Sequence, residues 1–177
     1  MQQLDEATLI KRARRNPDAF ALLYQQYLPR VYRYLYLRLG NHHDSEDIAS
    51  QVFIEVLDGL RRNRYKENGC FPAWMFTIVR RRLVDFRRQR APIPLEDGPS
   101  SDPNPLDQIQ ADENVERLSS LLAKLDEEKR EILRLRFAAE LSFAEIAALE
   151  NQSEAAVKMI VYRAIDWLRQ HWEAENG

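Results

Sequence analysis

The stretch Phe71–Arg90, FPAWMFTIVRRRLVDFRRQR, decides the fold of the first half of this 177-residue chain. Pro72 suits the first turn of a helix, where its missing N–H costs nothing, and no further Pro or Gly follows before Pro92. With a turn about every 3.6 residues, the apolar side chains form one stripe. Its members are Met75, Val79, Leu83 and Phe86. The stretch therefore predicts one helix that buries a single side.

The opposite side of this predicted helix is aromatic and basic, and the stretch holds six arginines. This side carries Trp74, Thr77, Arg81 and Arg88, flanked by Arg80 and Arg87. Aromatic rings can stack on unpaired bases while arginines hold a nucleic-acid backbone, so we interpret it as a nucleic-acid surface. Two plainer readings stay open: a solvated basic face, or a helix that binds only phosphate. Trp74 could also belong to the core.

The bulk composition bounds the class of protein. Hydrophobic residues make up 45% of the chain, but no uncharged apolar run approaches the roughly 18 residues of a membrane helix. The charged amino terminus does not resemble a secretory signal. Cys70 is the only cysteine, which excludes an internal disulfide and fits a reducing cytoplasm. Only five glycines and no alternating strand pattern predict an all-α chain.

Charge divides the chain into three parts. Residues 1–90 carry 17 Lys and Arg against 10 Asp and Glu, and residues 117–177 carry 9 against 11. Residues 91–116 have 7 acidic residues, no Lys or Arg, five prolines and a glycine. We therefore predict two small helical domains, 1–90 and 117–177, joined by a flexible acidic linker, 91–116. Only the first domain has a charge that attracts nucleic acid.

Helices are expected at 5–15, 17–39, 44–62 and 72–90, and Asp44 is expected to cap the third. Its apolar positions recur at core spacing, at Ala49, Val52, Phe53, Val56 and Leu60. The opposite face carries Asp47, Gln51, Ile54 and Asp58, and is either plain surface or a docking site. The loop that follows, 61–70, should present a basic and aromatic tip beside the next helix. The tip consists of Arg62, Arg64, Tyr65 and Lys66.

In the second domain, the sequence pattern predicts one or two helices at 118–137 followed by a helix-turn-helix. Ser142 and Glu145 form a capping-box pattern, Asn151 suits a left-handed turn, and Ser153 can cap a longer helix. The inward positions of that helix are Val157, Val161, Ala164 and Leu168. In such a motif the second helix can enter the major groove. A plain helical hairpin would show the same periodicity.

Taken in order, these motifs resemble the extracytoplasmic-function (ECF) sigma factors, the compact bacterial sigma-70 proteins that hold only regions 2 and 4. DAFALLYQQY, 18–27, is similar to the start of region 2, and DSEDIASQVFIEV, 44–56, to its polymerase-docking helix. Phe71–Arg90 is similar to the −10 helix, and LDEEKREILRLRF with 141–169 to region 4. The resemblance implies a cytoplasmic transcription initiation factor, not an enzyme, without cofactor or metal. Its implied partners are core RNA polymerase (β′ clamp helices and β subunit), promoter DNA and an anti-sigma factor.

The resemblance also implies site residues. Polymerase docking falls on Asp44, Glu46, Asp47, Gln51 and Ile54. Capture and holding of the −10 strand fall on Arg62, Arg64, Tyr65, Asn68, Phe71, Trp74, Thr77, Arg80, Arg81, Arg87 and Arg88. Contact with the −35 element falls on Ser153, Glu154, Lys158, Tyr162 and Arg163. The chain departs from the family pattern at Ser50 and Gln51, and at Met159 and Ile160, where Ser and Arg are common.

Two other functions stay open from the sequence. One is a helix-turn-helix regulator that binds duplex DNA without polymerase, and the other is a sigma-like adaptor that no longer binds promoters. A metal site is not expected at His42 and His43, because two adjacent histidines cannot readily bind one ion from a helix face.

Overall fold

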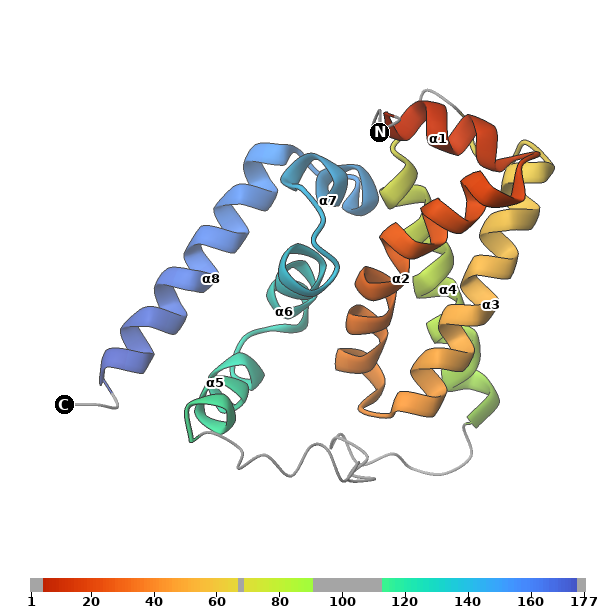
Figure 1. The fold of residues 1–177 in the computed structure, drawn as a ribbon. Coiled ribbons are helices and arrows are strands. Elements are labelled where there is room, and N and C mark those ends of the chain that lie inside the picture. The colour runs from red at the N-terminus through yellow and green to blue at the C-terminus, as the bar shows by residue number, and fades with distance from the viewer. Residues whose placement is uncertain (1–4, 67–68, 91–112, 175–177) are drawn as a thin grey trace. The chain divides into compact units, whose positions relative to one another are not determined.

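The computed structural model of the chain describes residues 5–66, 69–90 and 113–174. Within these ranges every regular element is a helix, which confirms the all-α prediction. The chain divides into two compact units between residues 100 and 101. Figure 1 shows α1 to α4 in the first unit and α5 to α8 in the second. Most of the predicted linker, 91–112, lies outside the described residues.

The first unit contains α1 (Glu6–Ala13), α2 (Pro17–Leu39), α3 (His42–Arg61) and α4 (Phe71–Arg90). Its core contains apolar and aromatic side chains from all four helices. They include Tyr27, Tyr34, Leu35, Val52, Met75, Phe76 and Val79. Met75, Val79 and Leu83 are buried as the stripe predicts, whereas Phe86 at its end is half-buried. The buried stripe holds α4 in the unit and leaves its other side outward.

The start of α3 differs from the prediction, because Asn41 and not Asp44 is its N-cap. Gly40 ends α2 in the left-handed conformation (φ 66°), and Asn41 is already extended (φ −134°). The Asn41 side-chain oxygen accepts a hydrogen bond from the Asp44 N–H at 2.9 Å. A two-residue turn therefore joins the helices, and Asp44 falls in the first helical turn, where an acidic side chain stabilises the helix dipole.

The second unit contains α5 (Glu113–Ala123), α6 (Glu127–Leu133), a π-helical turn η1 (Arg134–Ala138), α7 (Phe143–Glu150) and α8 (Glu154–Ala174). The start of α5 shows that residues 113–116 are helical, although the prolines before them placed them in the predicted linker. Buried side chains from every helix of the unit meet in one core. They include Leu121, Ile132, Leu135, Ile146, Val157, Val161 and Ala164. Leu168, expected inside, is half-buried.

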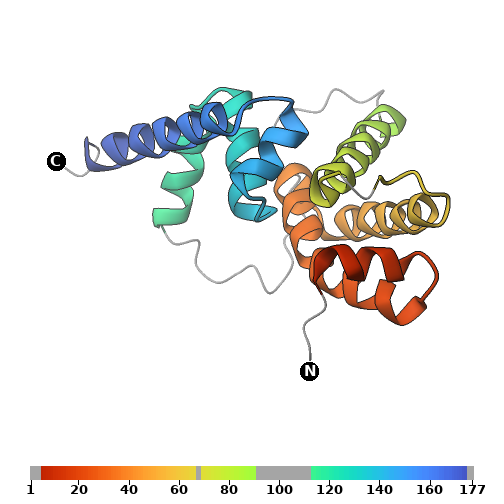
Figure 2. The same cartoon turned by 90° about the horizontal axis from the view of Figure 1, so that it is seen from above.

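The capping signals around α7 and α8 are confirmed. The Ser142 hydroxyl accepts from the Glu145 N–H at 3.2 Å, and the Glu145 carboxylate accepts from the Ser142 N–H at 2.6 Å. Asn151 is left-handed (φ 54°), and the Ser153 hydroxyl accepts from the Ala156 N–H at 3.1 Å. Seen from above in Figure 2, the short α7 leads into the long α8. Helix, tight turn and longer helix follow one another as the pattern predicts.

Candidate functional site

One face of α3 is exposed and mixes acidic, amide and apolar groups. Asp47, Gln51 and Ile54 follow one another at helical spacing, and Ile54 is 69% exposed. Glu46 is also exposed, one position before Asp47. The Asp47 carboxylate lies 3.1 Å from Nδ1 of His43, a pair in which both side chains are mostly exposed. This face leaves one large apolar side chain uncovered among polar ones, an arrangement found both on plain surface and at protein contacts.

Asp44, which the resemblance assigned to polymerase docking, is buried. Its carboxylate accepts a hydrogen bond from the Arg90 guanidinium at 2.6 Å, and its side chain is only 10% exposed. Arg90 ends α4 and also lies over the Phe86 ring, 4.6 Å from its centroid. Because α3 starts at His42, the Asp44 side chain turns toward α4. Asp44 therefore joins the two helices, in addition to any role at the surface.

The loop after α3 holds its arginines close to the helix end. Arg62 lies 2.7 Å and Arg64 3.7 Å from the carboxylate of Asp58, and both side chains are more than half exposed. Asn63 between them is left-handed (φ 55°), which turns the chain at the end of α3. Asn68, another predicted member of this site, lies outside the described residues. The loop is basic, as predicted, but one carboxylate is shared by two of its cations.

Tyr65 contradicts the prediction of an aromatic loop tip, since it is buried beneath the loop (6% exposed). Its ring centroid lies 5.3 Å from those of Phe71 and Trp74, and its hydroxyl donates to the Gly69 carbonyl at 2.5 Å. Phe71 is also buried and meets Tyr27 edge to face. Burying these rings removes more apolar surface from water than a projecting tip could. The aromatic cluster thus supports the loop from below.

Trp74 lies at the margin of this cluster, half-buried, with its indole over Gly59 of α3. On the same side of α4, Thr77 is exposed and its hydroxyl donates to the Ala73 carbonyl at 2.9 Å. One turn further, Arg81 is exposed and pairs with Glu55 of α3. This series, from Trp74 through Thr77 to Arg81, is the outward side that the helical spacing predicts.

The pairing with Glu55 is a feature that the sequence pattern did not reveal. One carboxylate, 14% exposed, contacts Arg81 and also Nε of Arg82 at 2.7 Å. The two cations therefore share a partly buried partner that joins α4 to α3. The remaining arginines of the predicted site are less uniform. Arg80 is half-buried, Arg87 donates to the Arg38 carbonyl at 3.4 Å, and Arg88 is exposed.

The beginning of α8 exposes the predicted −35 residues. Ser153, Glu154, Tyr162 and Arg163 are exposed, and Lys158 is half-buried. Glu154 accepts a hydrogen bond from Lys158 at 2.7 Å, which, with its charge, raises the pKa of Lys158 above its usual value of 10.5. Lys158 and Tyr162 both face the Phe143 ring of α7. Met159 is 51% exposed and Ile160 half-buried, so the family's polar positions are apolar on this surface.

The two adjacent histidines have different neighbours, since His43 pairs with Asp47 of the same helix. His42 stacks on Tyr32, lies at a tilt to the Tyr36 ring, and bonds to the Tyr32 hydroxyl through Nδ1. Among the described residues, no three His, Cys, Asp or Glu side chains are placed to hold a metal ion. No helix in the described ranges combines the length and hydropathy that crossing a membrane requires.

Comparison with known proteins gives a consistent family. A model described as Sigma-70 region 2 matches residues 23–93, and one described as Sigma-70, region 4 matches residues 121–170. The chain is 34% identical over 164 residues to the ECF RNA polymerase sigma factor BldN of Streptomyces coelicolor. The alignment covers 89% of this chain and 62% of BldN. It is 31% identical to the ECF RNA polymerase sigma factor RpoE of Cereibacter sphaeroides over 90% of each chain.

A solved structure supports the fold. CnrH, in its complex with the cytosolic domain of CnrY, superposes with a TM-score of 0.68. The match covers 96% of this chain and 97% of CnrH, at 23% sequence identity. Both sigma regions are matched in the expected order, and RpoE aligns over 90% of its length. The chain therefore belongs to the ECF RNA polymerase sigma factors of the sigma-70 family.

Proposed function

We propose that this sigma factor docks on core RNA polymerase through α3 and holds the opened −10 strand through α4 and the loop before it. The observation that carries the proposal is the Glu55 carboxylate with its two arginines. It fixes a cationic helix to a helix whose exposed face is acidic and apolar. A strand held by α4 would thus be held in a set position relative to the polymerase.

The docking contact centres on Ile54, with Asp47 and Gln51 beside it. An exposed apolar side chain ringed by polar groups suits a helical partner such as the β′ clamp helices. Ile54→Ala with Asp47→Ala is expected to weaken holoenzyme assembly. Leu37→Ala, which trims another exposed apolar side chain on α2, is the matched control. Equal affinities for the three proteins would remove this face from the interface.

Strand holding is assigned to the outward side of α4. Arginines neutralise backbone phosphates, and the cost of unstacking a base, a few kcal/mol, can be offset by a pocket that receives it. Arg80→Ala with Arg81→Ala should therefore impair open-complex formation and leave polymerase binding intact. Arg12→Ala removes an exposed cation from α1 and serves as the control. Unchanged opening in the double variant would show that α4 does not hold the strand.

The −35 element is assigned to Ser153 and to the amino-terminal half of α8, with Glu154, Lys158, Tyr162 and Arg163. In this motif the first residues of the second helix meet base edges in the major groove. Glu154 already holds Lys158, so base contact by either group must compete with that pair. Scrambling the −35 sequence of a recognised promoter should reduce transcription if α8 reads it.

A promoter library transcribed by this factor with core polymerase tests the whole proposal. Recovery of promoters with a shared −10 and −35 pattern supports it. Gel shifts with and without core polymerase separate the other functions: duplex binding by the factor alone indicates a regulator, and no promoter binding even with polymerase indicates an adaptor.

We also infer an anti-sigma factor as a regulatory partner. CnrH, which shares the fold, was solved in complex with the cytosolic domain of CnrY. Pull-down with a tagged copy of the full chain, competed by core polymerase, tests for such a protein. A partner that core polymerase does not displace would contradict this role.

A further inference from the structure

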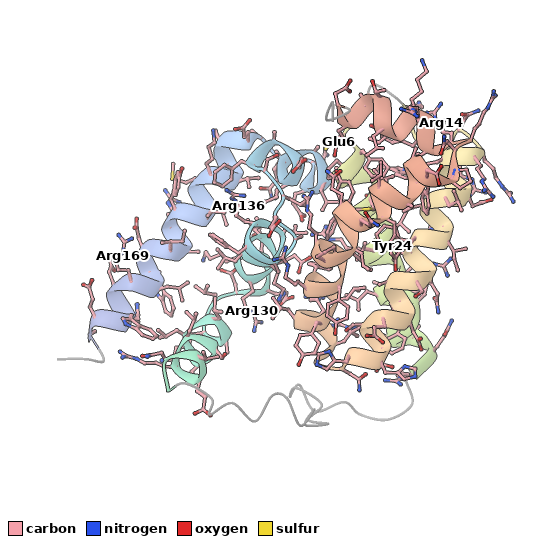
Figure 3. All side chains as sticks on the ribbon, viewed as in Figure 1. Glu6, Arg14, Tyr24, Arg130, Arg136 and Arg169 are labelled. Carbon is pink, nitrogen blue, oxygen red and sulfur yellow. The ribbon has the colours of Figure 1, made fainter. Side chains whose placement is uncertain are left out.

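A basic cavity opens between the end of α1 and the end of α3, beside the loop that follows α3. Its volume is about 340 Å³. The described residues that line it are Lys11, Arg14, Arg15, Arg61 and Asn63. Figure 3 labels Arg14 at the end of α1, beside the carboxyl end of α3. Four of the five lining side chains are cations, and no Asp or Glu is among these described lining residues.

The cations differ in what already binds them. Arg14 donates from Nη2 to the Tyr65 carbonyl at 3.2 Å, which ties the cavity wall to the loop after α3. Lys11, Arg15 and Arg61 are exposed, and none of the three forms an ion pair with a carboxylate in the described part of the chain. Elsewhere in the unit, arginines share carboxylates such as Asp58 and Glu55. Lys11, Arg15 and Arg61 thus gather positive charge in a concave site that has no carboxylate among its described lining residues, and such a site favours an anionic ligand.

The lining residues of this cavity come from the ends of two helices, α1 and α3. The chain turns between α1 and α2 through Arg15 and Asn16, and the Asn16 side chain caps α2 by accepting from the Ala19 N–H at 3.0 Å. At the other end, left-handed Asn63 turns the chain away from α3. The cavity therefore lies where the loop leaves α3, and Asn63 belongs to both.

We propose that this cavity holds a backbone phosphate of the single DNA strand that the loop and α4 retain. The proposal rests on the proposed function, because it places a phosphate next to the base-capturing loop. Guanidinium groups and an amide can donate several hydrogen bonds to phosphate oxygens. A phosphate contact carries no information about the base, so it would add affinity without sequence preference.

The test uses the holoenzyme and fork-junction DNA bearing a promoter recovered from the library. Arg15→Gln with Arg61→Gln removes two cavity cations, and Arg14 is left intact because it holds the loop. Binding is measured over a range of KCl concentrations. Loss of one single-strand phosphate contact should lower the slope of log K against log salt by about 0.7. Arg12→Gln, on α1 but not lining the cavity, should keep the wild-type slope.

A methylphosphonate scan then locates the phosphate. Making one linkage neutral should weaken wild-type binding severalfold, and that linkage should no longer matter in the double variant. If the double variant and Arg12→Gln have the same slope, or if the double variant remains sensitive to every neutral linkage, the assignment is overturned.

Free phosphate compounds are the other possible source of such an anion. Titration of pyrophosphate into the full chain without polymerase separates the two. Pyrophosphate binding that the double variant abolishes, together with unchanged salt slopes on DNA, would overturn the strand assignment. A holoenzyme that opens no library promoter refutes the proposed function, and the strand assignment with it. Unchanged slopes in a holoenzyme that does open its promoter refute the cavity assignment alone.

Discussion

A methyl group added at Gly59 would meet the indole ring of Trp74. A Cβ atom built at Gly59 would lie 2.8 Å from Cζ2 and 2.9 Å from Cη2 of that ring. The indole cannot simply swing away, because the rings of Tyr65 and Phe71 lie 5.3 and 5.7 Å from it, centroid to centroid. Gly59→Ala therefore forces a packed ring to shift.

The magnitude follows from two opposing terms. Replacing glycine by alanine inside a helix stabilises it by about 1 kcal/mol. Overpacking a well-filled site costs roughly 1 to 3 kcal/mol. Taking about 2 kcal/mol for the second term, Gly59→Ala should destabilise the first unit by about 1 kcal/mol. In a Trp74→Phe background the two clashing ring atoms are gone, and the same change should stabilise by about 1 kcal/mol.

Hydrogen exchange of α4 amides in the full chain measures this effect, because it reports opening of the first unit separately from the second. The four proteins of a double-mutant cycle should give a coupling of about 2 kcal/mol between the two positions. If Gly59→Ala stabilises α4 equally in both backgrounds, the indole does not pack against Gly59. The view of Trp74 as a ring fixed at the margin of the cluster would then be wrong.

Three further predictions address other contacts. Glu55→Gln should destabilise the first unit by about 1 to 2 kcal/mol after allowing for the partial exposure of its arginine partners, and should strengthen strand binding as Arg81 is released. Hydrogen exchange at α4 amides measures the loss of stability, and affinity for fork DNA measures strand binding. Weaker DNA binding would contradict the expected release of Arg81. Ser142→Ala should lower the free energy of opening of the second unit by about 1 kcal/mol, measured by hydrogen exchange at α7 amides, whereas Ser142→Thr should keep most of that stability. Hydrogen bonds from the Lys129 side chain and N–H lower the pKa of Asp126 below its usual 3.8. That stabilisation is full above the usual pKa and is lost as pH falls through the lower folded pKa, so Asp126→Asn should flatten the acid limb of a circular-dichroism titration.

Local sequence signals were sufficient to predict where most of the helices lie. The expected range 17–39 equals the observed α2, because Asn16, Pro17 and Gly40 mark both of its ends. The cap of α3 could not be chosen in the same way. Asn41 and Asp44 are both good N-caps, and the choice depends on where the preceding glycine reverses the chain.

The candidate site was less predictable because its contacts join distant parts of the chain. Tyr65 reads as a loop residue until the rings of Phe71 and Trp74 are brought beneath it. Spacing placed Arg81 on the outward side of α4, but its partner Glu55 comes from another helix. Helical periodicity indicates which way a side chain faces and is silent about what lies opposite it.

The ion pair between Arg90 and Asp44 fixes the last residue of α4 to the first turn of α3. A helical residue advances about 1.5 Å and an extended one about 3.4 Å, so unwinding one final turn would add about 7 Å of reach. A polymerase group that captures the Asp44 carboxylate would release this anchor. Docking would then lengthen the span over which the second unit can reach. It would also change the effective concentration of that unit at its own promoter element.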